Sequence, residues 1–169
     1  MMSDPTADPT LDRLLRHMAW ANAALFAQLA ELPDSALALA APRNEWTMAM
    51  ILEHIVMAAG GYAARLEGAS RPERTAPPGT VAELAELAAR CAAYDARIRA
   101  QAAVPDGPAE YPDRGKVLRA RSTILGQAIH HATEHWAQIA GALATNGIDA
   151  INLDSLDVWA YGDAEGLGA

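Results

Sequence analysis

The stretch Gln127–Ile139, QAIHHATEHWAQI, contains three of the five histidines of this 169-residue chain. Ala128, His131, His135 and Ile139 recur at spacings of three and four residues, which is the periodicity of a helix with one buried face. The segment therefore predicts a core helix whose inner face carries imidazoles. Burial alone disfavours such polar groups, which raises the question of why this face carries them.

The same periodicity, with helix start and stop signals, predicts three more long helices. Thr47 is the expected N-cap of the second helix, and Gly68 follows its expected end. Thr80 and Glu83 form a capping box at the start of the third helix. The predicted helices are Thr10–Leu32, Thr47–Glu67, Thr80–Ala103 and Val117–Thr145, followed by a short helix over Asp154–Ala164.

Four helices of this length, joined by moderate linkers, predict an all-α fold: a four-helix bundle with a short C-terminal helix. The length favours a single domain over residues 1–169. Residues 1–9 are expected to be disordered or extended, and residues 104–116 to form a loop or a short hairpin. Trp159 and Tyr161 are expected to dock the last helix on the bundle.

The composition argues against several classes of partner. A formal net charge of −8, with scattered arginines, argues against nucleic acid and anionic membranes. No stretch reaches the ~18 apolar residues of a membrane span. The N-terminal MMSDPTADPT lacks the basic and apolar regions of a signal peptide, so the cytoplasm is the expected location. The single cysteine, Cys91, excludes an intramolecular disulfide and is expected to be a small packed residue.

The histidines of two predicted helices point to a metal site. His131 and His135 are four residues apart on the inner face, the spacing by which two imidazoles of one helix reach a single metal ion. His54 lies on the apolar stripe of the second helix with Ile51 and Ile55; taken alone, it is better explained as a hydrogen-bonded core residue. Together the three histidines predict a metal, which requires neutral imidazole and gains from a dry environment.

Three histidines leave at least one coordination position for water or substrate, which is typical of catalytic sites. Imidazole ligation does not distinguish among Zn(II), Ni(II) and Fe(II). His130 is rotated by about 100° from His131, so it is expected to face another side of the helix and to be incidental.

The stretch HATEH also matches the H-x-x-E-H pattern of a class of zinc peptidases, in which Glu134 would be the general base. Such peptidases are much larger chains that take a further acidic ligand well downstream. Here the only glutamate after His135 is Glu165, in the tail. The peptidase interpretation is therefore disfavoured.

Three segments resemble the conserved blocks of the DinB-like four-helix bundle proteins. They are HMAWANAALF (17–26), WTMAMILEHIVMAAGGYAARLEG (46–68) and QAIHHATEHWAQI (127–139). The family includes damage-inducible DinB proteins and thiol-dependent transferases and isomerases that use mycothiol or bacillithiol. The resemblance implies that His54, His131 and His135 are metal ligands, the same residues that the helical stripes select.

The resemblance also implies that a divalent metal (Zn, Ni or Fe) activates a small thiol toward a small-molecule electrophile. Glu53 and Glu134 are candidates for orienting a ligand or relaying a proton, and a solvated helix residue is the alternative interpretation for each. Asn22, Trp136 and Gln138 are candidate substrate-binding residues. Asn22 is polar on an apolar stripe, where a core hydrogen bond is the alternative; Trp136 replaces an arginine common in the family, and Gln138 is retained.

Two further functions stay open. The same three ligands could activate water, which would make the chain a metal-dependent hydrolase. Alternatively, the metal is structural and the bundle is a non-catalytic dimerising module; a homodimer is expected because many helical bundles bury a face against their own copy. A catalytic site predicts an open pocket at the ligands, whereas a structural role predicts a sealed one.

Overall fold

The computed structural model describes residues 7–41, 45–112 and 118–167, which are helical apart from loops, one two-stranded sheet and an isolated bridge. The long helices are α1 (Pro9–Ala30), α2 (Met48–Glu67), α3 (Val81–Ala100) and α4 (Arg121–Thr145). The short elements are the 3-10 turns η1 (Asp34–Ala38), η2 (Gln101–Ala103) and η3 (Leu153–Leu156), strands β1 (Pro108–Ala109) and β2 (Arg119–Ala120), and helix α5 (Val158–Ala164). The predicted four-helix bundle with a short C-terminal helix is confirmed.

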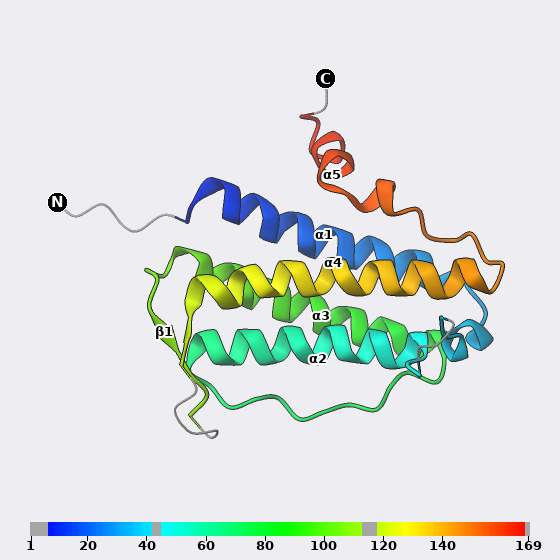
Figure 1. Cartoon of the computed structure of the whole chain (residues 1–169), viewed down its shortest axis with the longest axis horizontal. Helices are drawn as coiled ribbons and strands as arrows, with labels where there is room; N and C mark the ends of the chain where they lie inside the picture. The colour runs from blue at the N-terminus through cyan, green and yellow to red at the C-terminus, as the bar shows by residue number, and fades with distance from the viewer. Residues whose placement is uncertain (1–6, 42–44, 113–117, 168–169) are drawn as a thin grey trace.

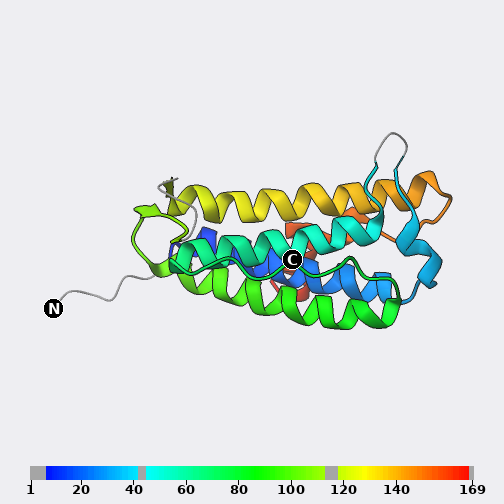
Figure 2. The same cartoon turned by 90° about the horizontal axis from the view of Figure 1, so that it is seen from below.

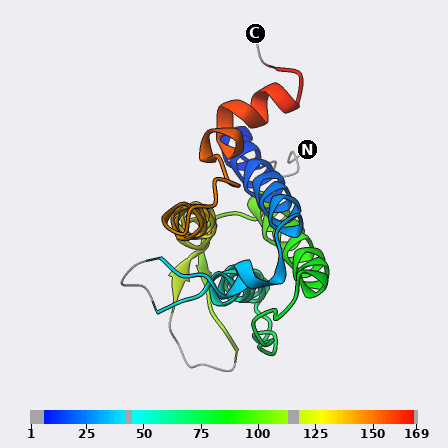
Figure 3. The ribbon, with the colours of Figure 1, turned by 90° about the vertical axis from the view of Figure 1, so that its right-hand side faces the viewer.

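The long helices form a bundle in which α1 and α2 lie at opposite corners. α1 packs against α3 and α4, and α2 packs against the same two helices, as the end-on view of Figure 3 shows. α2 and α3 run in the same direction, because residues 69–80 return along the length of α2 before α3 begins (Figure 1, Figure 2). The contact between α2 and α4 joins the helix of His54 to the helix of His131 and His135.

The residues predicted to begin and end the helices do so through side-chain caps and backbone conformation. Thr47 caps α2 with its side chain, and Gly68 ends α2 at φ +67°, a left-handed conformation that glycine adopts without a Cβ penalty. At the start of α3, the Thr80 hydroxyl accepts from the Glu83 amide at 3.4 Å. The Glu83 carboxylate accepts from the Gly79 amide at 2.6 Å. The capping box is thus present, with its carboxylate reaching one residue before the N-cap.

Some boundaries differ from the prediction. α3 ends at Ala100 and continues to Ala103 only as the 3-10 turn η2. α4 begins at Arg121, since the chain before it pairs with β1; its predicted start, Val117, lies outside the described residues. The predicted C-terminal helix is divided into η3 and α5 at Asp157, whose side chain caps α5.

The two predicted irregular segments are described only in part. Residues 1–6 lie outside the described residues, and α1 begins at Pro9 with the Asp8 carboxylate as its N-cap. β1 pairs antiparallel with β2. β2 begins at Arg119, so the second strand of this hairpin lies after the predicted range of 104–116. Within that range, residues 113–116 lie outside the described residues.

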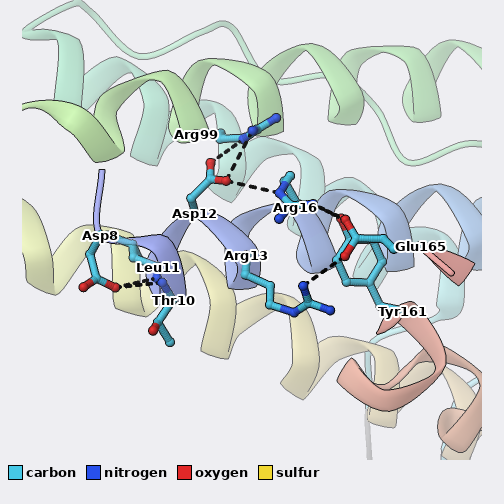
Figure 4. Close-up of polar contacts among 9 residues, drawn as sticks. All are labelled: Asp8, Thr10, Leu11, Asp12, Arg13, Arg16, Arg99, Tyr161 and Glu165. Atoms are coloured by element: carbon cyan, nitrogen blue, oxygen red, sulfur yellow. Dashed lines mark hydrogen bonds and ion pairs between the residues drawn. The ribbon is translucent and has the colours of Figure 1, made fainter. Parts of the chain in front are cut away.

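α5 is held against α1 by a polar cluster (Figure 4). The Tyr161 hydroxyl accepts from Arg16 at 2.9 Å and donates to Glu165 at 2.6 Å. Glu165 also pairs with Arg16 and, at 3.1 Å, with Arg13. Tyr161 therefore docks the helix as predicted, but Trp159 does not: its side chain is 84% exposed, because its phase on α5 turns it to solvent.

The core lies between the four long helices, and the predicted apolar stripe of each helix faces it. Its largest fully buried side chains are Leu15, Met18, Leu25, Leu29, Met48, Ile51, Leu52, Leu84, Ile98, Ile139, Leu143 and Leu156. Cys91 is 1% exposed, as expected for a packed residue. Within the described ranges, no helix combines the length and the hydropathy that crossing a bilayer requires.

Candidate metal centre

His54, His131 and His135 meet between α2 and α4. The Nε2 atom of His131 lies 2.9 Å from Nε2 of His54 and 3.0 Å from Nε2 of His135. One ring nitrogen from each residue lies within 4.8 Å of the other two. α4 supplies two rings from successive turns of one face, and the neighbouring α2 supplies the third. The structure thus brings together the three histidines that the helical stripes select.

Burial keeps two of these rings, those of His54 and His131, in the neutral form that binds metals. His135 is 6% exposed, and the other two are partly buried. Burial, with smaller effects of His135 and His54, lowers the pKa of His131 to about 4. Burial first, and then the nearby His135, also lowers the pKa of His54. Both rings are therefore neutral at pH 7, and neutral imidazole is the ligand form.

Gln138 orients one of the three histidines. Its Oε1 atom accepts a hydrogen bond from Nδ1 of His135 at 2.7 Å. This bond places the proton on Nδ1, so the lone pair of Nε2 faces the other two histidines. Partners of this kind fix the tautomer and the ring orientation of metal-binding histidines. This contact gives Gln138 a position behind His135, and its predicted role in substrate binding stays a prediction.

Two aromatic rings border the site. The Trp46 ring stacks on His135, with centroids 6.4 Å apart and planes at 15°, and it meets His54 edge-on at 4.8 Å. Tyr62 meets His131 edge-on at 5.7 Å. The sequence alone gave neither Tyr62 nor Trp46 a role at this site. The available signal was position: Trp46 directly precedes the N-cap of the helix that carries His54.

The donor set fits a divalent metal. Zinc binds imidazole at about 2.0–2.1 Å in tetrahedral sites, so two such nitrogens lie about 3.3 Å apart. The observed Nε2 separations of 2.9 and 3.0 Å are a few tenths shorter, a difference that small ring rotations supply. Three nitrogen donors also leave room for at least one further ligand.

A comparison with protein families agrees with this fold. The model of the DinB family matches residues 2–162. The chain belongs to the DinB family. The match covers nearly the whole chain, so the DinB resemblance inferred from three sequence blocks is confirmed. No curated protein matches the chain. DinB membership and a histidine triad able to hold a metal are therefore shown together.

The two candidate glutamates of this DinB protein lie in opposite environments. Glu134 is exposed, as expected for a solvated helix residue, and so is His130. Glu53 is 1% exposed, so the solvated-helix interpretation is wrong for it. Both of its oxygens accept from the Arg74 guanidinium at 3.0 Å, and this bidentate pair compensates for the burial of the carboxylate.

Asn22 and Trp136 belong to a buried hydrogen-bond network in the DinB bundle. Trp136 Nε1 donates to Asn22 Oδ1 at 2.8 Å, and Asn22 Nδ2 donates to Asp95 Oδ2 at 2.9 Å. These bonds use both ends of the Asn22 amide, which makes the core hydrogen bond its observed role. Asp95 was not predicted as a functional or buried residue. It follows Cys91 by four residues, so both lie on the inner face of α3. A role of either residue in substrate binding stays a prediction.

Proposed function

We propose that this DinB protein is a metal-dependent enzyme that activates a small thiol for transfer or isomerisation. One observation carries the proposal: three histidine donors converge beside a cavity of about 320 Å³ whose wall includes His54. Three protein ligands with access for a small molecule are typical of catalytic metal sites, whereas structural sites are closed by a fourth ligand.

Each residue has a defined task in this proposal. The three histidines would bind the metal through Nε2, and Gln138 accepts the hydrogen bond from Nδ1 of His135. The rings of Trp46 and Tyr62 limit the access of water to the histidines. A divalent cation bound there would lower the pKa of a coordinating thiol, so that the sulfur attacks an electrophile as thiolate and its proton passes to solvent.

Metal analysis of the purified protein tests the ligand assignment. The parent and a His130→Ala control are expected to retain stoichiometric metal, because His130 is exposed and outside the triad. His131→Ala and His135→Ala are expected to lose it, since two imidazoles bind far more weakly than three. Equal metal content in all four proteins would overturn the site.

A thiol titration of the cobalt-substituted protein separates the candidate functions. A thiolate-to-cobalt charge-transfer band that saturates with added mercaptoethanol supports thiol activation. Absence of that band, combined with metal-dependent hydrolysis of ester substrates, would instead favour the hydrolase. Absence of both, with a lower melting temperature after metal removal, would favour a structural metal in a non-catalytic bundle. The choice among zinc, nickel and iron, the homodimer and the cytoplasmic location all stay predictions.

A further inference from the structure

Two consecutive glycines interrupt the middle of α2. Glycine weakens a helix interior, so its presence at Gly60 and Gly61 calls for a structural reason. A Cβ on Gly60 would lie 2.8 Å from Cγ of Pro72, and a Cβ on Gly61 would lie 3.0 Å from Nη2 of Arg71 and 3.1 Å from the Tyr111 hydroxyl. The glycines therefore let residues that follow α2 lie directly on its surface.

The segment that they accommodate is the return connection, residues 69–80, which crosses the length of α2 (Figure 1). Between this connection and α2 lies the cavity of about 320 Å³, lined by His54, Met57, Ala58, Arg71, Pro72 and Arg74. His54, a residue of the candidate metal centre, therefore lines one side of the cavity. Arg71 and Arg74 line the side formed by the return connection. The volume suits a small molecule.

The two arginines of this cavity differ in their charge compensation. Arg74 is neutralised by its bidentate pair with Glu53. Arg71 forms no ion pair with any residue in the described ranges, and its guanidinium stacks on the Tyr111 ring at 5.5 Å. Tyr111 is in turn anchored, because its hydroxyl donates to the Gly61 carbonyl at 2.7 Å. Arg71 thus presents a positioned positive charge to the cavity.

The spacing along α2 defines the shape of a ligand for this cavity. Gly61, on which the Arg71 guanidinium rests, follows His54 by seven residues. Seven residues are two helical turns, so the two positions share a face and lie roughly 10 Å apart. Ala58 lies between them and lines the cavity with only a methyl group. An occupant that reaches both ends therefore needs a metal-binding atom at one end and an anionic group at the other.

We infer that the thiol substrate carries a carboxylate, which Arg71 binds while the sulfur lies at the three histidines. The planar guanidinium fork matches a carboxylate bidentately, and Arg71 has no carboxylate partner within the described residues. The inference rests on the proposed function and narrows its substrate class to small anionic thiols. It also explains why α2 tolerates glycine at position 61, where any side chain would crowd the guanidinium.

A matched pair of thiols tests this inference on the cobalt-substituted full-length protein. The probes are ω-mercaptohexanoate and ω-mercaptohexanol, which have the same six-carbon chain and differ only at its end, a carboxylate in one and a neutral alcohol in the other. The charge-transfer band reports their dissociation constants. The carboxylate is expected to bind about tenfold more tightly than the alcohol, as a charge-assisted hydrogen bond provides. This preference is expected to shrink as salt is raised, because Arg71 is exposed.

Two variants and one control locate the effect. Arg71→Met removes the charge and is expected to abolish the preference without weakening ω-mercaptohexanol. Gly61→Ala keeps the charge but displaces the guanidinium, so it is expected to reduce the preference while strengthening the helix. Arg90→Met removes the charge of an exposed arginine on α3 and is expected to leave the preference intact.

The outcomes distinguish this inference from the proposed function. Equal affinity for both thiols, or a preference that survives Arg71→Met, would overturn the carboxylate site while thiol activation stands. If neither thiol produces the band on cobalt-loaded protein, the proposed function fails, and the inference falls with it. A preference lost in Arg71→Met and kept in Arg90→Met supports both.

Discussion

Replacing Asp95 by asparagine is expected to stabilise the protein in a pH-dependent manner. The Asp95 carboxyl is 2% exposed, and Oδ2 accepts from Asn22. Its other oxygen, Oδ1, has no hydrogen-bond partner among the described residues. Burial, opposed only partly by the hydrogen bonds from Asn22 and Cys91, raises the pKa of Asp95 from 3.8 to about 6. An asparagine keeps an oxygen for the Asn22 bond and removes the buried charge.

The size of this stabilisation follows from the difference between the pKa of Asp95 in the folded state and its pKa in the unfolded state. A raised carboxyl pKa means that the folded state holds its proton more tightly, so folding is penalised once the unfolded state ionises. The penalty is small below pH 4, grows between about pH 4 and pH 6, and is complete above pH 6. At ~1.36 kcal/mol per pKa unit, the shift of Asp95 from 3.8 to about 6 corresponds to about 3 kcal/mol.

Urea unfolding of metal-free protein, followed by circular dichroism between pH 4 and pH 8, measures this penalty. The free energy of unfolding of Asp95→Asn is expected to exceed that of the parent by about 3 kcal/mol at pH 8 and by less than about 1 kcal/mol at pH 4. The exposed Asp149→Asn serves as a control for the loss of one charge. A variant no more stable than the parent at pH 8, or a gain that persists unchanged at pH 4, would refute the reasoning.

Three further outcomes are expected. Gln138→Ala should weaken metal binding about 10- to 100-fold in a chelator competition, because His135 loses the partner that fixes its tautomer. Trp136→Phe should lower the free energy of unfolding by about 1–3 kcal/mol without changing metal content, since Asn22 Oδ1 loses its buried donor; unchanged stability would contradict this. Burial raises the pKa of Cys91, so a thiol reagent should label it only when the protein is unfolded.

Local rules were sufficient to predict the helices and the histidines that face the core. Thr47 and Gly68 mark the ends of α2 because capping depends on residues adjacent in the chain. His131 and His135 share a face because the helix itself sets the angle between residues four apart. His130 is exposed for the same reason: one residue of displacement rotates a side chain away from the core. These predictions needed no knowledge of what lies opposite each helix.

Long-range packing decided the remaining features, because the environment of a side chain depends on segments distant in the sequence. His54 and His131 are 77 positions apart, and only the contact of α2 with α4 brings their nitrogens to 2.9 Å. Glu53 is on the surface of α2 considered alone, yet the return connection covers it and supplies Arg74 as its counterion. The positive charge of Arg71 beside the histidines has the same origin, so helix phase predicted the three converging histidines but not the cavity next to them.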